Sequence, residues 1–344
     1  MSVWIWVLVL LAAVWAAHWG AEHLAHPLKK LRKQWGFSVA AGGALVGLAA
    51  ASPEIGINIT AAITGVGDIG LGTMFGSNVI AIPIMVVTAY IATRHLKKEN
   101  RDKGHEMHVR EHLLRVNKTA VTVLALPYLV IIAVVAILTV PPDWRGLQPI
   151  DGWIMLGMYV VFLLQALLRG KKESEQVEWK KKEIWLAVAG VAVLGLGAYF
   201  TVLATENIVK ALGISKIVGG LFITAPMAAL PEIFATWSVA KSGQITSGVS
   251  SVIGDHAVTL TVAFLPLALV TVPVNNFPLF ATVLSFVGLV GVLYAAFIHW
   301  GRSQGVHGFK RWQVFTLAAV ALVYVAVVLF GVLQVFTGGS GSSS

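Results

Sequence analysis

The chain has 344 residues, of which 57% are apolar and only 12% are charged, and its mean hydropathy is +0.80. Soluble globular proteins carry about 25% charged residues, so this composition excludes an ordinary soluble domain. The net charge of +9 does not indicate a nucleic-acid partner, because nearly all of the 25 Lys and Arg residues lie in short loops between apolar blocks. We therefore expect a multi-pass integral membrane protein whose surroundings are the lipid bilayer.

Ten apolar segments follow one another along the chain, each long enough to cross a bilayer as a helix. The first has no basic lead-in and no small-residue cleavage site, so we interpret it as a transmembrane helix and not as a removable signal. The prediction is an all-α polytopic membrane protein with ten transmembrane helices. The segments span residues 3–24, 37–64, 69–93, 119–140, 152–168, 184–205, 214–240, 246–272, 277–299 and 312–336. Residues 338–344 read GGSGSSS and are expected to be an added linker outside the fold.

The loops between these segments differ in their basic residues. On one side of the membrane the loops carry 22 Lys and Arg residues, whereas the other side carries only Arg145, Lys210 and Lys216. Cytoplasmic loops are enriched in Lys and Arg, so the side with 22 is predicted to be cytoplasmic. With an even number of helices, both termini are then outside, and we expect a prokaryotic plasma membrane.

The two halves of the chain resemble each other at a constant offset of 178 residues. AASPEIGINITAAITG followed by GTMFGSNVIA is similar to AALPEIFATWSVAKSG followed by SVIGDHAVT. Because five predicted helices separate the copies, the second copy enters the membrane upside down, as in secondary transporters built from inverted repeats. We divide the chain into a first repeat (1–168, core 42–84), a cytoplasmic linker (169–183) and a second repeat (184–337, core 220–262). The offset pairs Gly42 with Gly220, Pro53 with Pro231, Glu54 with Glu232 and Gly76 with Gly254.

Three acidic residues lie inside apolar segments, where each costs roughly 2.5–3.5 kcal/mol on insertion scales. Glu54 and Glu232 each follow a proline, and Asp255 lies in the segment after the second Pro-Glu pair. Pro53 and Pro231 each remove a backbone hydrogen bond, which bends the helix and frees carbonyls as ion ligands. Intramembrane carboxyls are functional by default, although protonated, hydrogen-bonded core carboxyls are the alternative.

Carboxylates and carbonyls form an oxygen-only shell, which suits Ca²⁺, and two protons could occupy the same glutamates instead. No resident cofactor is expected. Further candidate ligands or proton carriers are polar residues in the same segments: Ser77, Asn78 and His256, followed by Asn58, Thr236, Ser52 and Thr259. Each of these side chains can equally be an ordinary interhelical hydrogen-bonder.

On these residues the sequence resembles the cation/calcium exchanger superfamily, which includes sodium/calcium and calcium/proton exchangers. The features in common are a Pro-Glu in the first repeat, a Gly-Ser-Asn beginning 22 residues later at Gly76, and an inverted second copy. The resemblance implies that segments 2, 3, 7 and 8 form the ion-binding core and that segments 1 and 6 form a sliding gate. It also implies that Glu54 and Glu232 ligate Ca²⁺.

The sequence also departs from the sodium/calcium exchangers, in which the residues up to the glutamate typically read Thr-Ser-Leu-Pro-Glu. Both hydroxyls are missing from each copy, which has Ala50-Ala51 or Ala228-Ala229 in place of Thr-Ser. Further along, a polar residue of the family is Ala81 in the first copy and Thr259 in the second. The usual Ser-Asn of the second copy is Asp255-His256. Because calcium/proton exchangers also lack the Thr-Ser pair, these changes favour protons over Na⁺ as the counter-ion. Alternatives are a Na⁺/H⁺ or other monovalent cation exchanger, a cation channel and an intramembrane metal-dependent enzyme.

Two groups of histidines remain outside this site. His105, His108 and His112 recur along the longest cytoplasmic loop, where a solvated helix face is the simple interpretation and a regulatory metal site the alternative. His18 and Glu22, near the end of the first segment, are interpreted as interfacial, although they could line an external access path.

Overall fold

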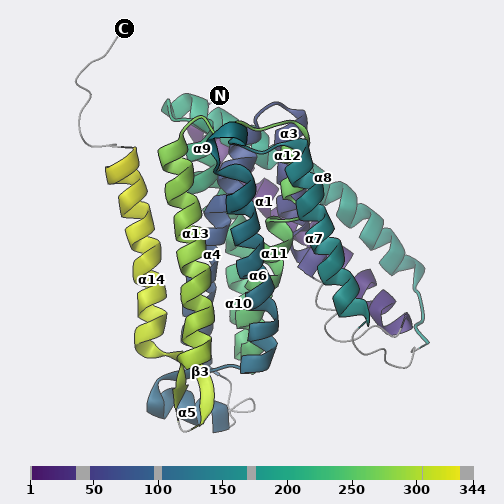
Figure 1. Cartoon of the computed structure of the whole chain (residues 1–344). Coiled ribbons are helices and arrows are strands. Elements are labelled where there is room, and N and C mark those ends of the chain that lie inside the picture. Colours follow the sequence, from purple (N-terminus) through teal and green to yellow (C-terminus); the bar gives the residue numbers. More distant parts are fainter. Residues whose placement is uncertain (1, 36–46, 97–102, 169–175, 304, 334–344) are drawn as a thin grey trace.

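A computed structural model of the chain describes residues 2–35, 47–96, 103–168, 176–303 and 305–333. The protein is a bundle of long helices with a small sheet at one end (Figure 1). The helices of the first half are α1 (Val3–Gln34), α3 (Ser52–Ile63), α4 (Gly67–Arg94), α5 (Lys103–Glu111), α6 (Lys118–Thr139), the short 3-10 helix η2 (Pro142–Trp144) and α7 (Pro149–Leu168). Those of the second half are α8 (Lys181–Leu212), α9 (Lys216–Gly219), the π-helix η3 (Gly220–Thr224), α10 (Ala225–Lys241), α11 (Ile245–Thr259), α12 (Phe264–Leu269), α13 (Phe277–Trp300), α14 (Arg311–Ala326) and the π-helix η4 (Val327–Val332).

The predicted helical membrane architecture is confirmed. Seven helical stretches in the described part of the chain are long and apolar enough to span a bilayer, and two shorter apolar helices cover Leu124–Thr139 and Pro149–Leu164. Of the predicted segment 37–64, only residues from 47 onward are described, so Gly42 lies outside the described residues, as does the 338–344 tail. The count of ten helices therefore stays a prediction.

The helix boundaries repeat with the same offset of 178 residues. Both ends of α1 match both ends of α8, the end of α3 matches that of α10, and the start of α4 matches that of α11. The regular spacing extends the similarity from the two motifs to the helices that surround them.

The matched helices also run in opposite directions. Gly67, at the start of α4, packs against Val272, which follows α12 and pairs with Leu147. Thr246, at the start of α11, accepts a 3.0 Å hydrogen bond from the backbone N–H of Asn117. Because Asn117 and Leu147 flank α6 at its two ends, α4 and α11 begin at opposite ends of the bundle, as inverted copies must.

Helix α4 forms the centre of the protein, and 83% of an apolar 18-residue stretch of it is buried. Glycines allow the backbone of the N-terminal half of α4 to touch the backbone of α9 and η3. A Cβ on Gly72 would lie 2.3 Å from the carbonyl oxygen of Ile217, and one on Gly220 would lie 2.3 Å from that of Ile69. Such contacts between small residues replace the hydrophobic driving force that is absent between helices in a bilayer.

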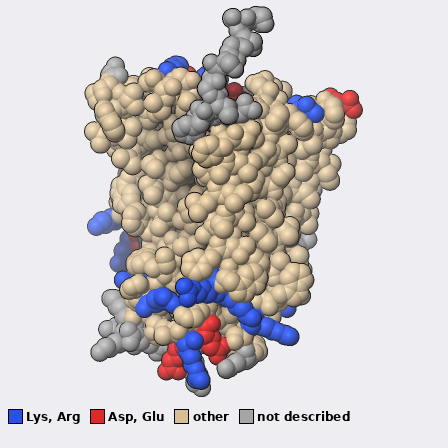
Figure 2. Space-filling view, turned by 90° about the vertical axis from the view of Figure 1, so that its left-hand side faces the viewer, with Lys and Arg blue, Asp and Glu red and all other residues tan. Residues whose placement is uncertain are grey.

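A small antiparallel sheet was not predicted. Strand β3 (Val306–Lys310) lies between β1 (Leu113–Arg115) and β2 (Arg302–Ser303), with Leu113 opposite Lys310. With α5 it covers the lower end of the bundle in Figure 1. In Figure 2, Lys and Arg side chains form a band near this end, below a broad uncharged surface.

Candidate cation-binding site

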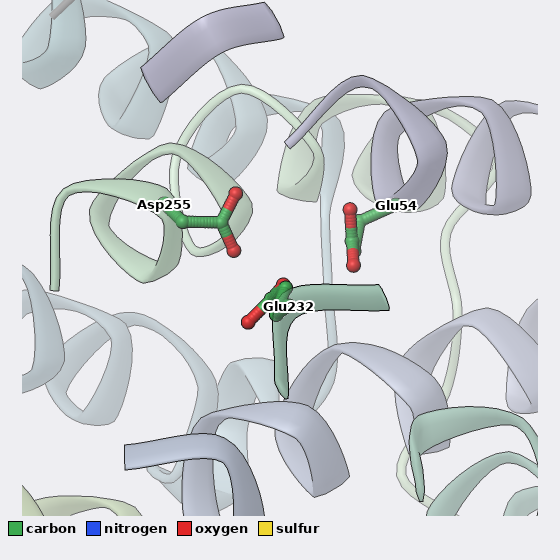
Figure 3. A group of neighbouring side chains, drawn as sticks. All are labelled: Glu54, Glu232 and Asp255. Atoms are coloured by element: carbon green, nitrogen blue, oxygen red, sulfur yellow. The ribbon is translucent and has the colours of Figure 1, made fainter. Parts of the chain in front are cut away.

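Three acidic side chains converge in the interior of the bundle. Glu54 comes from α3, Glu232 from α10 and Asp255 from α11, so both repeats contribute. One carboxylate oxygen from each lies within 4.8 Å of the other two, and Figure 3 shows the three groups facing a common space. Glu54 and Asp255 are each only 4% exposed. The sequence motifs, which are far apart in the chain, thus meet at one point.

The helix backbone is irregular near both glutamates. Pro53 occupies the first turn of α3, where its missing N–H leaves a carbonyl unsatisfied one turn earlier. The hydroxyl of Ser52 donates a 2.7 Å hydrogen bond to that carbonyl, which belongs to Ala49. In the second copy the position of Ser52 is Leu230, which has no hydroxyl, and the π-helix η3 precedes α10. The two halves therefore break the regular helix in different ways.

A small cavity of about 20 Å³ adjoins the two glutamates. Its walls are Glu54 and Pro53 from α3, Glu232 and Pro231 from α10, Val14, Ala17 and His18 from α1, and Thr201 from α8, with Ala50 and Ala228 beside them. This volume suffices for about one water molecule or one ion. Helices α1 and α8 close one side of the site, so a movement of this pair would change access to it.

The site carries a large uncompensated negative charge when it is ionised. Among the described residues, no Lys or Arg forms an ion pair with any of the three carboxylates, and Glu54 Oε2 has no hydrogen-bond partner. Two unit charges at the 4.8 Å limit repel each other by about 3.5 kcal/mol at an effective dielectric constant of about 20. Three such pairs cost about 10 kcal/mol, which is similar to the whole stability of a typical domain. Protons or a cation must therefore occupy the site.

His256 lies beside Asp255 in α11. Its Nδ1 is 3.4 Å from Asp255 Oδ2, the ring is 1% exposed, and neither ring nitrogen has a hydrogen bond of normal geometry among the described residues. Neither His256 nor Asp255 lines the small cavity, but Asp255 has a carboxylate oxygen within 4.8 Å of both glutamates. The geometry fits a neighbour of Asp255 more closely than a direct cation ligand.

The polar residues of α4 make hydrogen bonds within the protein. Asn78 donates to the carbonyl of Met74 at 2.7 Å and accepts from the Tyr128 hydroxyl at 2.9 Å. Ser77 also donates to the Met74 carbonyl, at 3.1 Å. Neither residue lines the cavity, so a role as cation ligand remains a proposal that needs a change of side-chain conformation.

The remaining predicted ligands are also engaged elsewhere. Asn58 donates to the carbonyl of Ala263 at 2.7 Å, and the hydroxyl of Thr236 donates to the sulfur of Met85 at 3.2 Å. Thr259 donates to the carbonyl of Asp255, at 3.1 Å. The first two bonds tie α3 to the segment after α11 and α10 to α4, whereas the third lies within α11.

Of the two interpretations of His18, the structure favours the access path over the interface, because this residue lines the cavity beside the glutamates. Its Nε2 lies 3.5 Å from a carboxylate oxygen of Glu22, and its side chain is 24% exposed. The position related by the 178-residue offset is Leu196, so only the first repeat places a titratable group there. The same intramembrane rule that singled out the glutamates applies to His18.

The three histidines His105, His108 and His112 do not gather around a metal. Among the described residues, only Glu54, Glu232 and Asp255 form a group with metal-ligand spacing. His105 Nδ1 lies 3.1 Å from the carbonyl of Thr93, and His108 packs edge-on against Tyr90 with ring centroids 4.6 Å apart. Burial lowers the pKa of His108 to about 4. The predicted solvated face is also wrong, since both residues are buried.

Comparisons with known proteins agree with the architecture and with the repeat. The sequence profile of the family described as "Sodium/calcium exchanger protein" matches residues 2–168 and 182–336. A search of curated proteins found no match. Three similar solved structures are of the sodium-calcium exchanger NCX_Mj, soaked with 10 mM Na⁺ and zero Ca²⁺, with 100 mM Na⁺ and 10 mM Sr²⁺, and with 2.5 mM Na⁺ and 0.1 mM Ca²⁺.

The first of these structures has a TM-score of 0.61 and 20% sequence identity, and the match covers 95% of this chain and 100% of that one. The second has a TM-score of 0.58 and 20% identity, covering 94% and 99%. The third has a TM-score of 0.57 and 19% identity, again covering 94% and 99%. At this level of identity the likeness demonstrates a common fold.

Proposed function

The chain belongs to the sodium/calcium exchanger family, whose members are membrane transporters and not enzymes, and from this premise we propose that it is a divalent cation antiporter. Glu54 and Glu232 bind the transported cation together, with Asp255 as the third carboxylate. Ca²⁺ is the cation that the donor set fits best, and protons are the counter-ion. The observation that carries the proposal is the meeting of three buried carboxylates from both repeats within 4.8 Å.

The oxygen-only donor set supports the choice of Ca²⁺. Ca²⁺ takes 6–8 oxygen ligands in a flexible arrangement, and three carboxylates can supply up to six. Soft metals prefer sulfur and imidazole ligands, whereas the chain has no cysteine and His18 is the one imidazole among the described residues that line the cavity. Mg²⁺ demands a tighter octahedral shell and keeps several waters, for which the 20 Å³ cavity leaves little room.

Electrostatic repulsion supports proton coupling. A divalent cation neutralises two of the three carboxylates, and two protons achieve the same neutralisation when the cation leaves. The cavity wall has Ala50 and Ala228 where sodium/calcium exchangers carry hydroxyl residues, so fewer side-chain oxygens are available for Na⁺. Each transport cycle then exchanges one divalent cation for protons on the same carboxylates.

The packing of α1 against α8 supports alternating access by sliding. A Cβ on Gly197 would lie 2.5 Å from the backbone nitrogen of Ala17, and one on Gly20 would lie 2.3 Å from the carbonyl oxygen of Gly190. Because small residues let the two backbones touch, α1 and α8 pack closely against each other and can move as one unit. In Figure 1 the lower part of this pair slopes away from the bundle. Its movement would expose the glutamates to one side of the membrane at a time.

Sodium/calcium exchange is the second candidate, and the fold shared with NCX_Mj favours it. Backbone carbonyls at the two proline positions could build a sodium site that no side-chain pattern reveals. The two candidates differ in the gradient that drives transport.

Flux measurements in proteoliposomes test the proposal. We expect a pH gradient without Na⁺ to drive ⁴⁵Ca²⁺ movement in the wild type and not in Glu232→Gln. Flux that requires Na⁺ and ignores the pH gradient would replace proton coupling with sodium coupling. Wild-type flux in Glu232→Gln would overturn the site itself.

A further inference from the structure

A second hollow, separate from the carboxylate site, lies at the end of the bundle that holds the small sheet. Its volume is about 590 Å³, and it lies between the end of α5, strand β2 and the start of α14. Two basic side chains, Lys310 and Arg311, and two aromatic side chains, Trp312 and Phe315, form one wall. His112, directly after α5, also lines the hollow. A hollow of this size is in the range that binds small ligands.

The walls of the hollow are held together by specific contacts. The carbonyl of His112 accepts a 3.1 Å hydrogen bond from the backbone N–H of Arg311, and its Nδ1 lies 2.8 Å from Nη2 of Arg94. His112 has a backbone φ of +53°, in the left-handed region that residues other than glycine rarely adopt. Glu111, the acidic residue of the lining, accepts a hydrogen bond from the hydroxyl of Ser303. The basic side chains, with Arg94 beside them, outnumber this acid.

The hollow lies at one end of a membrane-spanning helix, at the depth of the lipid headgroups. The apolar span that ends the described chain begins at Arg311, so the hollow is at the boundary between membrane and water. Trp312 is 57% exposed and Phe315 is 56% exposed, and the Arg311 guanidinium lies 5.4 Å from the centre of the Phe315 ring. Aromatic residues with exposed rings favour the headgroup region of a bilayer.

The surface above the hollow is apolar. Leu322, Val323 and Phe330, further along α14 and η4, are 72%, 51% and 57% exposed. Figure 2 looks from the side on which α14 lies and shows the basic band directly below this uncharged surface. A ligand with an anionic head and apolar tails matches both parts.

We propose that this hollow binds the headgroup of an anionic phospholipid. The phosphate lies between Lys310 and Arg311, and the acyl chains run along α14 beside Phe315. The apolar continuation of the site favours a lipid over a free phosphate ion. The basic loops predict that this end faces the cytoplasm, where anionic lipids attract basic residues close to the membrane. The lipid would tie α5 and the sheet to α14, whichever ions the carboxylate site exchanges.

Native mass spectrometry of the purified protein tests this proposal. The detergent-solubilised full chain is titrated with phosphatidylglycerol and, separately, with phosphatidylcholine. Each basic residue near an anionic lipid surface contributes about a fivefold change in affinity, so Lys310→Gln with Arg311→Gln should weaken the first phosphatidylglycerol roughly thirtyfold. Arg115→Gln with Lys118→Gln removes the same charge at the same end, outside the hollow, and should leave that affinity unchanged.

A photoreactive phosphatidylglycerol provides a second measurement on the wild type, which does not depend on the folding of any variant. Crosslinks should map to residues 306–315, and phosphatidylcholine should not compete. Equal weakening in both double variants, or crosslinks spread over the apolar surface, would overturn the proposal. Displacement of the lipid by inorganic phosphate at the same concentration would identify a free-anion site and would also overturn it.

Discussion

Neutralising one glutamate should weaken divalent cation binding far more than it affects folding. In Glu54→Gln the side chain keeps its length and one oxygen but loses a unit charge. A carboxylate oxygen about 2.4 Å from Ca²⁺ contributes about 14 kcal/mol of attraction at an effective dielectric constant of about 20. The same substitution removes two repulsions of about 3.5 kcal/mol each, since Glu54 faces both other carboxylates within 4.8 Å.

The difference, about 7 kcal/mol, is an upper limit, because water and the Gln oxygen replace part of the lost attraction. Even about 2.8 kcal/mol corresponds to a hundredfold rise in Kd, which is the smallest change that we expect. Equilibrium binding of ⁴⁵Ca²⁺ to the purified protein at pH 8 measures it. Glu206→Gln is the matched control, because Glu206 pairs with Lys210 and Lys216 outside the site. A Kd for Glu54→Gln within threefold of the wild type would refute the reasoning.

Three further predictions concern the gate, the topology and the end of the bundle that holds the small sheet. Gly197→Ala places a Cβ 2.5 Å from the backbone of Ala17, which should force α1 and α8 apart and slow flux at least tenfold while Ca²⁺ binding persists, whereas Gly195→Ala, which meets nothing within 4 Å, should not. Equal flux in both would contradict a gate in which α1 and α8 move as one closely packed pair. Single cysteines at Glu106 and Asp143, in this cysteine-free chain, should be labelled from opposite sides of the membrane, and labelling from one side would refute the predicted topology. The pKa of His108 is about 4 in the folded protein and about 6.5 when unfolded, so stability is lost as pH falls below about 6.5 towards 4. The protection factors of amide hydrogens in α5 and β1, which correct for the intrinsic slowing of exchange at lower pH, should therefore fall between pH 7 and 5 in the wild type and not in His108→Leu; the same fall in both would exclude His108 as the cause.

The arrangement of the helices and the position of the glutamates were predictable because both depend on long-range patterns in the sequence. Apolar segment length marks the spans, and the 178-residue offset places Glu54 and Glu232 in related positions of inverted copies. Asp255 was predictable from its cost inside an apolar segment. Their mutual proximity in the structure agrees with these arguments.

Other features depend on side-chain contacts that no sequence pattern encodes. Asn78 bonds to Tyr128, 50 residues away, and Thr236 bonds to Met85, 151 residues away. The sheet likewise joins β1 to β3 across most of the chain, and its strands are too short for an alternating pattern. The predicted end of the first segment at residue 24 favoured an interface for His18 over the alternative of an access path, whereas α1 continues to Gln34 and His18 lines the cavity.

Counting the protons released when the site binds a cation tests the central claim most directly. Purified protein in a weakly buffered solution near pH 7 is titrated with Ca²⁺ in the absence of Na⁺, and a pH indicator records the protons. If one divalent cation and protons occupy the same three carboxylates in turn, binding should release up to two protons per Ca²⁺, and Glu54→Gln should abolish the release. Stoichiometric Ca²⁺ binding with no proton release, undiminished in Glu54→Gln, would contradict the account.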